Sequence, residues 1–469
     1  MALERWENWA GNLYCSCNVV APRSLEQLCE VVKHAAGSGG RLRAAGGSYS
    51  WSPLVLSGDT DTIVRMDQLD RVLHFDNRTG AVEVECGVRI KALTSAAAAH
   101  GLTVVTPTLF PKPTIGGAIA VGAHGTDFRN GGIEDRILEM KIVDAQGDVR
   151  VVTWNDLDMG AAKVALGTLG LMYSVTLQLE PQYDVATEIR LLPVKQVLAE
   201  FDDLQASCGF LEMFWFPFQK NMWVYMMDRT TAPRDRNTWW TRLKRNVNTG
   251  VQNVASQRLI PWLARHAPQL TPVLNTIASR LAFHEGLTVQ TASDAFHFQR
   301  AYAKCWEMEY AVPAADAARV WRDGIALVEH YAASALHPVN LALHGRFTGA
   351  SSAWIAPNYG RPTCYIDVTT AAGTPHWRDF FGELEKQWIA IPGARPHWGK
   401  LFFQRDDLVT RYDQMQRFLA VRQRWDPQRV FLNRFLEEEI FKLAPHSPRP
   451  QPQPTQSSAS RTAAAAAAP

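Results

Sequence analysis

Along the first 180 residues, the apolar positions alternate between helical spacing and strand spacing. A helical stripe runs over 25–35, with Ser24 before it and Gln27 three residues after Ser24 as a capping box. We expect this helix to end at a group of glycines, Gly37, Gly39 and Gly40. The pattern then predicts a strand at 42–45, a hairpin over 72–84, a helix over 90–99 ended by Gly101, and a second hairpin turning at 144–147. Paired strands with interleaved helices predict an α+β fold.

The pattern changes near residue 183, where aromatic-rich strand segments become frequent. These segments lie at 210–227, 306–313, 340–347 and 363–369, with helical patterns between them. The change predicts that a second domain begins near this point. From 445 onward the chain is rich in Pro, Gln, Ser and Ala without a hydrophobic pattern, which predicts a disordered tail.

Length and composition limit the class of protein. A chain of 469 residues exceeds what one hydrophobic core usually serves, so two domains are expected. A net charge of +2 argues against nucleic-acid binding through bulk charge. No apolar run reaches the ~18 residues of a membrane span. Charged residues stand at the N-terminus where a signal peptide needs an apolar stretch, so we expect a cytoplasmic protein.

One basic stretch leaves membrane association open. It spans 229–265 and contains Trp239 and Trp240 among its arginines and lysines. Such a segment is either a solvated helical surface of the protein or a peripheral contact with an anionic membrane.

Several kinds of chemistry are not indicated by the sequence. Its seven cysteines include no Cys-x-x-Cys pair, which disfavours zinc and thioredoxin-type sites, and we expect no metal. The phosphate loop, the H-E-x-x-H and G-x-S-x-G motifs and a strand–G-x-G-x-x-G–helix unit are also absent. A Rossmann nucleotide site is therefore not expected.

Two glycine-rich segments, 45–53 and 112–126, are the clearest candidates for a ligand site. Glycine lets the backbone approach a ligand closely, and successive backbone N–H groups in such turns can bind anions. Each segment alone is explained by a tight turn between buried strands. Together, in an α+β context, they favour a cradle for the two phosphates of a dinucleotide.

At these segments the sequence resembles the FAD-linked oxidases and dehydrogenases of the vanillyl-alcohol oxidase type. Within them it is most similar to the sugar-lactone and alditol oxidases, which include arabinonolactone and gulonolactone oxidases. The resemblance covers residues 8–440. Besides the two glycine-rich segments, it rests on the segments 166–170 (L-G-T-L-G), 307–313, 395–400 (R-P-H-W-G-K) and 426–433.

The resemblance implies a fold and a set of cofactor contacts. Residues 1–182 would form a two-subdomain FAD-binding domain of the PCMH type, and 183–404 an α+β substrate domain (the cap) with an antiparallel sheet. Residues 405–444 would return to the FAD domain, ahead of the tail at 445–469. The implied FAD contacts are Gly46, Gly47, Ser48, Tyr49, Ser50, Thr114, Ile115, Gly116, Gly117, Ala120, Gly122, His124, Gly125, Thr126 and Gly170.

Tyr49 departs from the family pattern in the first segment. Many members attach FAD covalently through a histidine in a G-x-x-H-S arrangement, but this chain has tyrosine at that position. A phenol lacks the imidazole nitrogen that forms the bond to the flavin. The cysteine that makes a second link in some relatives is also absent from 106–113. We therefore expect FAD to be bound non-covalently.

His344 departs from the pattern in the cap. Lactone and alditol enzymes carry a Glu-x-Arg pair that faces the substrate, whereas this chain retains Arg346 and has histidine in place of the glutamate. Carboxylates accept hydrogen bonds from polyol hydroxyls, while a neutral histidine offers one donor and one acceptor. The segments 51–54 and 338–340 also resemble the cholesterol-oxidase branch. A less hydroxylated or more apolar substrate would fit such a site.

Alcohol oxidation on a flavin requires a base for the hydroxyl proton and positive charge near the flavin. Lys400 is the candidate for that charge and Arg346 for orienting a substrate oxygen; a surface lysine and a structural ion pair are the alternatives. His344 and His397 are candidate bases, because histidine titrates near neutral pH, and a satisfied core histidine is the alternative for each. His124 is expected to have a structural hydrogen-bonding role.

The main hypothesis is an FAD-dependent oxidoreductase that oxidises a CH–OH group by hydride transfer to flavin N5. The small-molecule substrate would be a sugar lactone, polyol or related alcohol, and the acceptor oxygen or an electron carrier. Two alternatives stay open: an oxidase or dehydrogenase of a larger apolar alcohol, and a flavin-binding protein without turnover.

Overall fold

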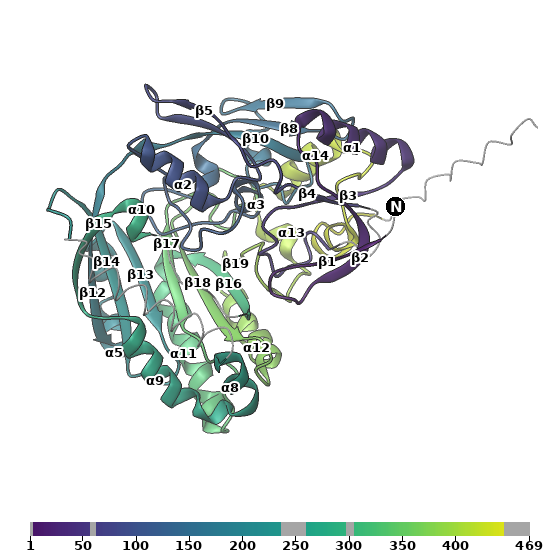
Figure 1. The fold of residues 1–469 in the computed structure, drawn as a ribbon. Coiled ribbons are helices and arrows are strands. Elements are labelled where there is room, and N and C mark those ends of the chain that lie inside the picture. The colour runs from purple at the N-terminus through teal and green to yellow at the C-terminus, as the bar shows by residue number, and fades with distance from the viewer. Residues whose placement is uncertain (1–2, 57–61, 236–258, 297–303, 445–469) are drawn as a thin grey trace, which may run out of the picture.

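The computed structural model describes residues 3–56, 62–235, 259–296 and 304–444. Figure 1 shows a large sheet in teal and green beside two smaller sheets in purple and blue. The predicted tail at 445–469 and the centre of the basic stretch, 236–258, lie outside the described residues. Among the helices that are described, none is long and apolar enough to cross a membrane.

The N-terminal sheet has four strands in the order β1-β2-β4-β3, with β4 parallel to both of its neighbours. The strands are β1 (Glu4–Glu7), β2 (Tyr14–Val20), β3 (Leu42–Ala45) and β4 (Thr62–Arg65). Helix α1 (Leu25–Ser38) joins β2 to β3 and begins at the predicted Ser24 cap. The helix continues through Gly37 and ends at Gly39, whose φ of +77° is a conformation that favours glycine.

The second sheet has five antiparallel strands in the order β5-β6-β10-β8-β9. Its strands are β5 (Val72–Asp76), β6 (Ala81–Glu85), β8 (Ile137–Val143), β9 (Val149–Thr153) and β10 (Leu171–Gln178). Both hairpins predicted from the sequence are therefore present. The associated helices and short elements are α2 (Ile90–Ala99), β7 (Leu102–Thr103), α3 (Ile115–Val121), η1 (Ile133–Arg136), α4 (Met159–Ala162) and β11 (Glu180–Pro181).

The third sheet has eight strands in the order β15-β12-β14-β13-β17-β18-β16-β19, and every neighbouring pair is antiparallel. Its strands are β12 (Asp184–Pro193), β13 (Phe210–Trp215), β14 (Asn221–Thr230), β15 (Gly286–Thr291), β16 (Cys305–Pro313), β17 (Leu343–Thr348), β18 (Thr363–Ala371) and β19 (Arg395–Pro396). The predicted segment 210–227 is thus a hairpin of two strands. The α+β fold with a large antiparallel sheet is confirmed.

Helices surround this third sheet. They are α5 (Val194–Ala199), α6 (Phe201–Ala206), α8 (Ile260–His266), η3 (Pro268–Leu270), α9 (Thr271–Ala282), α10 (Ala292–Ala295), η4 (Ala314–Asp316), α11 (Ala317–Ala333) and α12 (Trp377–Ile389). Side chains alternate along a strand, so the sheet has two different faces. On one face Leu211, Trp215 and Ile366 share a core with α11 and α12. The opposite face carries the intervening residues, and it contains the polar side chains described below.

The C-terminal segment packs against the second sheet. It contains α13 (Leu408–Arg411), α14 (Met415–Trp425) and the π-helix η5 (Phe435–Ile440). Phe418 and Leu436 belong to the same core as Val84 and Leu169. In Figure 1 the yellow C-terminal helices accordingly lie among the purple and blue elements. The expected domain boundaries stay a prediction, although the strands of the large sheet lie between 184 and 396.

Arg43, in β3 just before the first glycine-rich segment, connects three distant segments of the chain. Its guanidinium is buried and donates hydrogen bonds to the carbonyls of Leu54 at 2.7 Å and Leu166 at 2.6 Å, and to that of Phe431. Burial lowers the pKa of Arg43 to about 9, although Asp426 favours the charged form. The segments 166–170 and 426–433 thereby hold the first glycine-rich segment in place.

Candidate functional site

A continuous cavity of about 1190 Å³ runs between the two glycine-rich segments and the polar face of the large sheet. Its wall includes most of the residues that the sequence singled out: Gly46, Gly47, Ser48, Tyr49, Ser50, Thr114, Gly116, Gly117, Ala120, His124, Gly170, His344, Arg346, His397 and Lys400. Gly46 and Lys400, 354 positions apart in the chain, therefore meet at one site.

Four of the predicted cofactor contacts lie away from this wall. Ile115 is fully buried in the core, and Gly122 ends α3 with a φ of +66°. Gly125 packs so closely on Pro107 that a Cβ would lie 2.3 Å from its carbonyl oxygen. The Thr126 hydroxyl donates to the carbonyl of Leu211 at 2.8 Å. These four residues therefore support the second glycine-rich segment from positions outside the cavity wall.

The two glycine-rich segments meet directly. A Cβ added to Gly46 would lie 2.2 Å from the Thr114 hydroxyl oxygen, so only glycine permits this approach. Thr114 itself caps α3 by accepting a hydrogen bond from the N–H of Gly117 at 3.3 Å. The segments predicted to cradle a dinucleotide therefore form adjacent walls of one cavity.

The first glycine-rich segment also contacts the H-W-G-K segment at 397–400. The backbone N–H of Trp51 donates to the carbonyl of Gly399 at 2.8 Å, and the Ser52 hydroxyl donates to that of Trp398. The Trp51 indole donates to the carbonyl of Cys305, at the start of β16, at 2.7 Å. These contacts place Lys400 beside the first segment.

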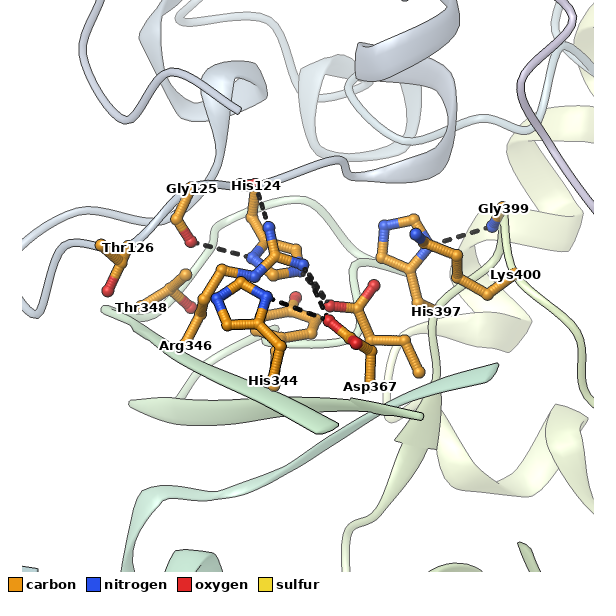
Figure 2. Close-up of polar contacts among 12 residues, drawn as sticks. His124, Gly125, Thr126, His344, Arg346, Thr348, Asp367, His397, Gly399 and Lys400 are labelled. Atoms are coloured by element: carbon orange, nitrogen blue, oxygen red, sulfur yellow. Dashed lines mark hydrogen bonds and ion pairs between the residues drawn. The ribbon is translucent and has the colours of Figure 1, made fainter. Parts of the chain in front are cut away.

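A row of side chains crosses four strands on the polar face of the sheet. The strand register places Phe214 opposite His344, His344 opposite Asp367, and Asp367 opposite Glu309. Side chains directly opposite on one face of a sheet are close enough to interact. The His344 and Phe214 rings stack with centroids 4.1 Å apart, and His344 Nδ1 lies 3.2 Å from Asp367 Oδ2. Figure 2 shows His344 and Asp367 side by side.

Arg346 forms the centre of a second buried group. Its Nη2 lies 2.5 Å from Glu309 Oε1, and its Nη1 donates to the carbonyl of His124 at 3.3 Å. His124 Nε2 lies 3.2 Å from the same Glu309 oxygen, and its ring stacks on Tyr365. Burial opposes the ionisation of Glu309, but Arg346 and His124 hold the pKa of this carboxyl well below its usual range. Arg346 and the second glycine-rich segment are therefore linked through the Glu309 carboxylate.

His344 and His397 have opposite electrostatic environments. Burial disfavours the charged form of His344, but the neighbouring carboxylates Asp367 and Glu212 raise its pKa overall. Burial lowers the pKa of His397 to about 3. The backbone N–H of Gly399 donates to His397 Nδ1 at 3.1 Å, so the neutral ring carries its proton on Nε2. His344 can therefore act as a base near neutral pH, whereas His397 can act only as a neutral hydrogen-bond donor.

Lys400 is half-buried and forms an ion pair with Glu307 of β16. Its ammonium group also lies 4.6 Å from the centre of the Trp51 ring. Burial disfavours the charged form, but Glu307 and the other nearby carboxylates raise the pKa of Lys400 overall. Lys400 is therefore a permanent positive charge at the cavity wall.

Three side chains of this site could in principle act as metal ligands. His124, Glu309 and His397 each offer one ligand atom, and these atoms lie within 4.8 Å of one another. However, Arg346 occupies Glu309 Oε1, and a guanidinium beside the same oxygen repels a metal cation. We therefore assign the cluster to the ion-pair network of Arg346.

Sequence reasoning missed three carboxylates of the site: Glu212, Glu309 and Asp367. All three lie in strand segments that the sequence predicted, 210–227, 306–313 and 363–369, but none of them was given a role. A usable signal was present, because each acid interrupts an apolar strand at a position that faces away from the core. What could not be predicted was their pairing, which depends on the register between strands distant in the chain.

The arrangement fits a flavin dinucleotide. The two glycine-rich segments meet without side chains between them, the cavity extends from them to the cap sheet, and a fixed cation stands at its wall. A cavity of this size accommodates a long cofactor and a small substrate together. Fold and site therefore define an FAD-linked oxidoreductase.

Comparisons with known proteins agree with this class. A family model described as D-arabinono-1,4-lactone oxidase matches residues 175–439, and one described as FAD binding domain matches 18–153. L-gulono-1,4-lactone dehydrogenase of Mycobacterium tuberculosis is 31% identical, over 91% of this chain and 97% of the relative. Alditol oxidase of a Streptomyces species is 26% identical, over 92% of this chain and 98% of the relative.

Solved structures show the same fold at lower identity. Cholesterol oxidase from B. sterolicum superposes with a TM-score of 0.79 at 19% identity, over 93% of this chain and 97% of that one. The chain belongs to the D-arabinono-1,4-lactone oxidase family. It is an FAD-dependent oxidoreductase that acts on the CH–OH group of a small molecule.

Proposed function

We propose that the substrate is a sugar lactone, a polyol or a closely related alcohol, and that its reacting carbon lies against the polar face of the cap sheet. One observation carries this proposal. His344, Arg346 and Lys400 are brought to one cavity wall beside both glycine-rich segments. Buried charged groups of this kind are costly without a function or a partner, and they suit a substrate that offers hydroxyl and carbonyl oxygens.

His344 is the proposed base. Oxidation of CH–OH to C=O releases one proton from the hydroxyl and one hydride from the carbon. Asp367 Oδ2 lies 3.2 Å from Nδ1. Nε2 lies 3.6 Å from Glu212 Oε2 and has no hydrogen bond among the described residues, so Nε2 can accept the hydroxyl proton. FAD, when bound, supplies the acceptor of the hydride. His397 is excluded as the base in this proposal because its Nδ1 is engaged and its pKa is about 3.

In the proposal, Arg346 positions a substrate oxygen and Lys400 neutralises negative charge. Glu309 engages Nη2 of the Arg346 guanidinium and the His124 carbonyl engages Nη1. The remaining nitrogen, Nε, is buried without a hydrogen bond among the described residues and is left to orient a substrate oxygen. Lys400 supplies positive charge where electron density increases during the reaction. His397, through Nε2–H, donates a hydrogen bond at the same wall.

We propose further that FAD is bound non-covalently. Tyr49 lines the cavity where many family members have the linking histidine, and its ring packs against Trp9 and Phe110 with centroids 5.8 and 5.0 Å away. A phenol fixed in this way can pack against the flavin.

The proposed function is tested by product analysis. The FAD-loaded protein is incubated with a panel of sugar lactones and alditols, either in air or with an artificial electron carrier. A product that has lost two hydrogen atoms is expected for at least one panel member. Turnover in air identifies oxygen as acceptor, and turnover that requires the carrier identifies a dehydrogenase. No oxidised product under either condition contradicts the proposal.

The basic stretch at 229–265 decides between a solvated surface and a contact with a membrane. Arg229 pairs with Glu180, and Arg234 with Asp184, each at 2.8 Å. These pairs support the interpretation of the described part as a solvated surface, and a cytoplasmic location stays our proposal. Flotation with anionic liposomes tests the alternative, because only a membrane-binding protein would float.

A further inference from the structure

The cavity extends beyond the polar cluster into a second compartment, which we call the apolar arm. It lies between α8, α9 and strand β13. Its wall is formed by Phe214, Phe216, Leu263, Ala264, Thr271, Leu274, Asn275, Ala278 and Phe283. Leu259 and Ile277 stand at its rim and are 52% and 51% exposed.

The arm begins directly beside the proposed base. Phe214 stacks on His344 with ring centroids 4.1 Å apart, and it also contacts Phe283 at 5.1 Å and Tyr225 at 5.4 Å. Phe283 in turn lies 5.7 Å from Phe216. Because Phe214 and His344 are neighbours in the same transverse row, a ligand at His344 can extend into the arm without leaving the cavity.

The arm is poorly suited to hydroxyl groups. Its two polar members are Thr271 and Asn275, and the Asn275 amide already donates to the carbonyl of Pro217 at 3.3 Å. A polyol placed there would lose hydrogen bonds to water without replacing them, which is unfavourable. An alkyl group would instead remove apolar surface from water, which is favourable.

We propose that the substrate carries an apolar group, such as an alkyl or acyl chain, attached to the alcohol that is oxidised. The hydroxyl-bearing part contacts His344 and Arg346, and the apolar group occupies the arm. This inference rests on the proposed function and deepens it, because it names a second feature of the substrate.

The test compares two ligands with the same polar part. Methyl and hexyl β-glucosides are titrated into the FAD-loaded protein by calorimetry. The hexyl compound is expected to bind at least ~10-fold more tightly, because its additional methylene groups become buried. Equal affinities would overturn the proposal.

Variants locate the effect in the arm. Ala278→Phe places a ring in the arm and is expected to abolish the preference for the hexyl compound without weakening the methyl compound. Val273→Phe is the matched control, because residue 273 lies on the same helix, is 60% exposed and does not line the cavity. Leu274→Asn makes the arm polar at similar volume and is expected to reduce the preference in the same direction. A preference that persists in both arm variants would also overturn the proposal.

The binding test of the apolar arm and the test of the proposed function can fail independently of each other. Lactone or alditol oxidation without a preference for the hexyl ligand would refute the apolar arm alone. Preferential binding of the hexyl ligand without oxidation of any alcohol would refute the proposed function alone.

Discussion

At the scale of single residues, each cation of the site has its own carboxylate. Arg346 pairs with Glu309, Lys400 with Glu307, and His344 with Asp367. Removing one partner of a buried pair leaves the other unpaired, so these pairs fix positions as well as charges. The three cations differ in chemistry, because only the imidazole exchanges a proton near neutral pH. Their separate roles can therefore be tested one carboxylate at a time.

The first prediction concerns Asp367. If neutral His344 is the base, kcat/KM rises with pH through a pKa above the ordinary value of 6.5 for histidine. In Asp367→Asn the imidazolium loses a stabilising anion, so its pKa falls. The rising limb of the plot of kcat/KM against pH then moves to lower pH. Asp379→Asn, at an exposed position on α12, should leave the limb unchanged. A limb that does not move in Asp367→Asn would rule out this assignment of the base.

The second prediction concerns Lys400. Lys400→Met removes the positive charge and should slow anaerobic reduction of the flavin by substrate about 100-fold, the usual cost of losing one stabilising group. The double variant Lys400→Met/Glu307→Gln also removes the unpaired carboxylate and should remain slow. Lys386→Met, on an exposed part of α12, should react at the normal rate. Recovery in the double variant would show that the unpaired Glu307, and not the lost charge, causes the defect.

At this scale the sequence predicted the basic side chains of the site better than their carboxylate partners. His344, Arg346, His397 and Lys400 all line the cavity. Asp367 and Glu212 were missed, because the family pattern placed a carboxylate at position 344 itself. The structure instead provides carboxylates on the neighbouring strands, a pairing that follows from strand register.

At the scale of secondary-structure elements, the site depends on the two faces of one sheet. Gly345 lies between His344 and Arg346 and points toward the core. A Cβ there would lie 2.7 Å from the Trp321 ring of α11, which is closer than van der Waals contact allows. The glycine lets α11 pack tightly behind the two functional residues and thereby holds them toward the cavity.

The third prediction tests this packing. Gly345→Ala should lower the free energy of unfolding by about 1–3 kcal/mol, because the core must shift to accept the methyl group. The matched control is Gly382→Ala on α12, where an added Cβ meets nothing within 4 Å and alanine favours the helix. Denaturant unfolding measures both changes. A loss for Gly345→Ala no greater than that of the control would contradict the packing argument.

The elements themselves were largely predictable. Periodicity located α1, the hairpin β5–β6 and the strands of the cap, because these depend on local spacing and turn residues. The order of the eight strands was not predictable from periodicity, because β13 pairs with β17 across more than a hundred residues of intervening chain. The predicted end of α1 at a group of glycines is confirmed, because the helix continues through Gly37 and ends at Gly39.

At the scale of the whole molecule, the cavity is assembled from three parts of the chain. Arg43 and Asn433 connect the first glycine-rich segment to the C-terminal segment, and Asn433 donates to the carbonyl of Pro53 at 2.9 Å. His124 connects the second glycine-rich segment to the cap through Glu309 and Tyr365. Cofactor and substrate sites therefore form together when the chain folds.

The fourth prediction concerns the cofactor as a whole. Acid precipitation of the purified protein should release the flavin into the supernatant, because Tyr49 cannot form the usual bond through imidazole. The flavin content of the two fractions is measured by absorbance. Flavin that stays with the precipitated protein would show that another residue forms a covalent bond.

The most direct test of the account is anaerobic reduction of the bound flavin. The FAD-loaded protein is mixed without oxygen with sugar lactones, alditols and their alkyl derivatives, and the visible absorbance of the flavin is followed. The account predicts that at least one CH–OH substrate bleaches the flavin, and that Lys400→Met slows this bleaching. A protein that binds FAD fully but is bleached by none of these compounds would contradict the claim that this site oxidises alcohols.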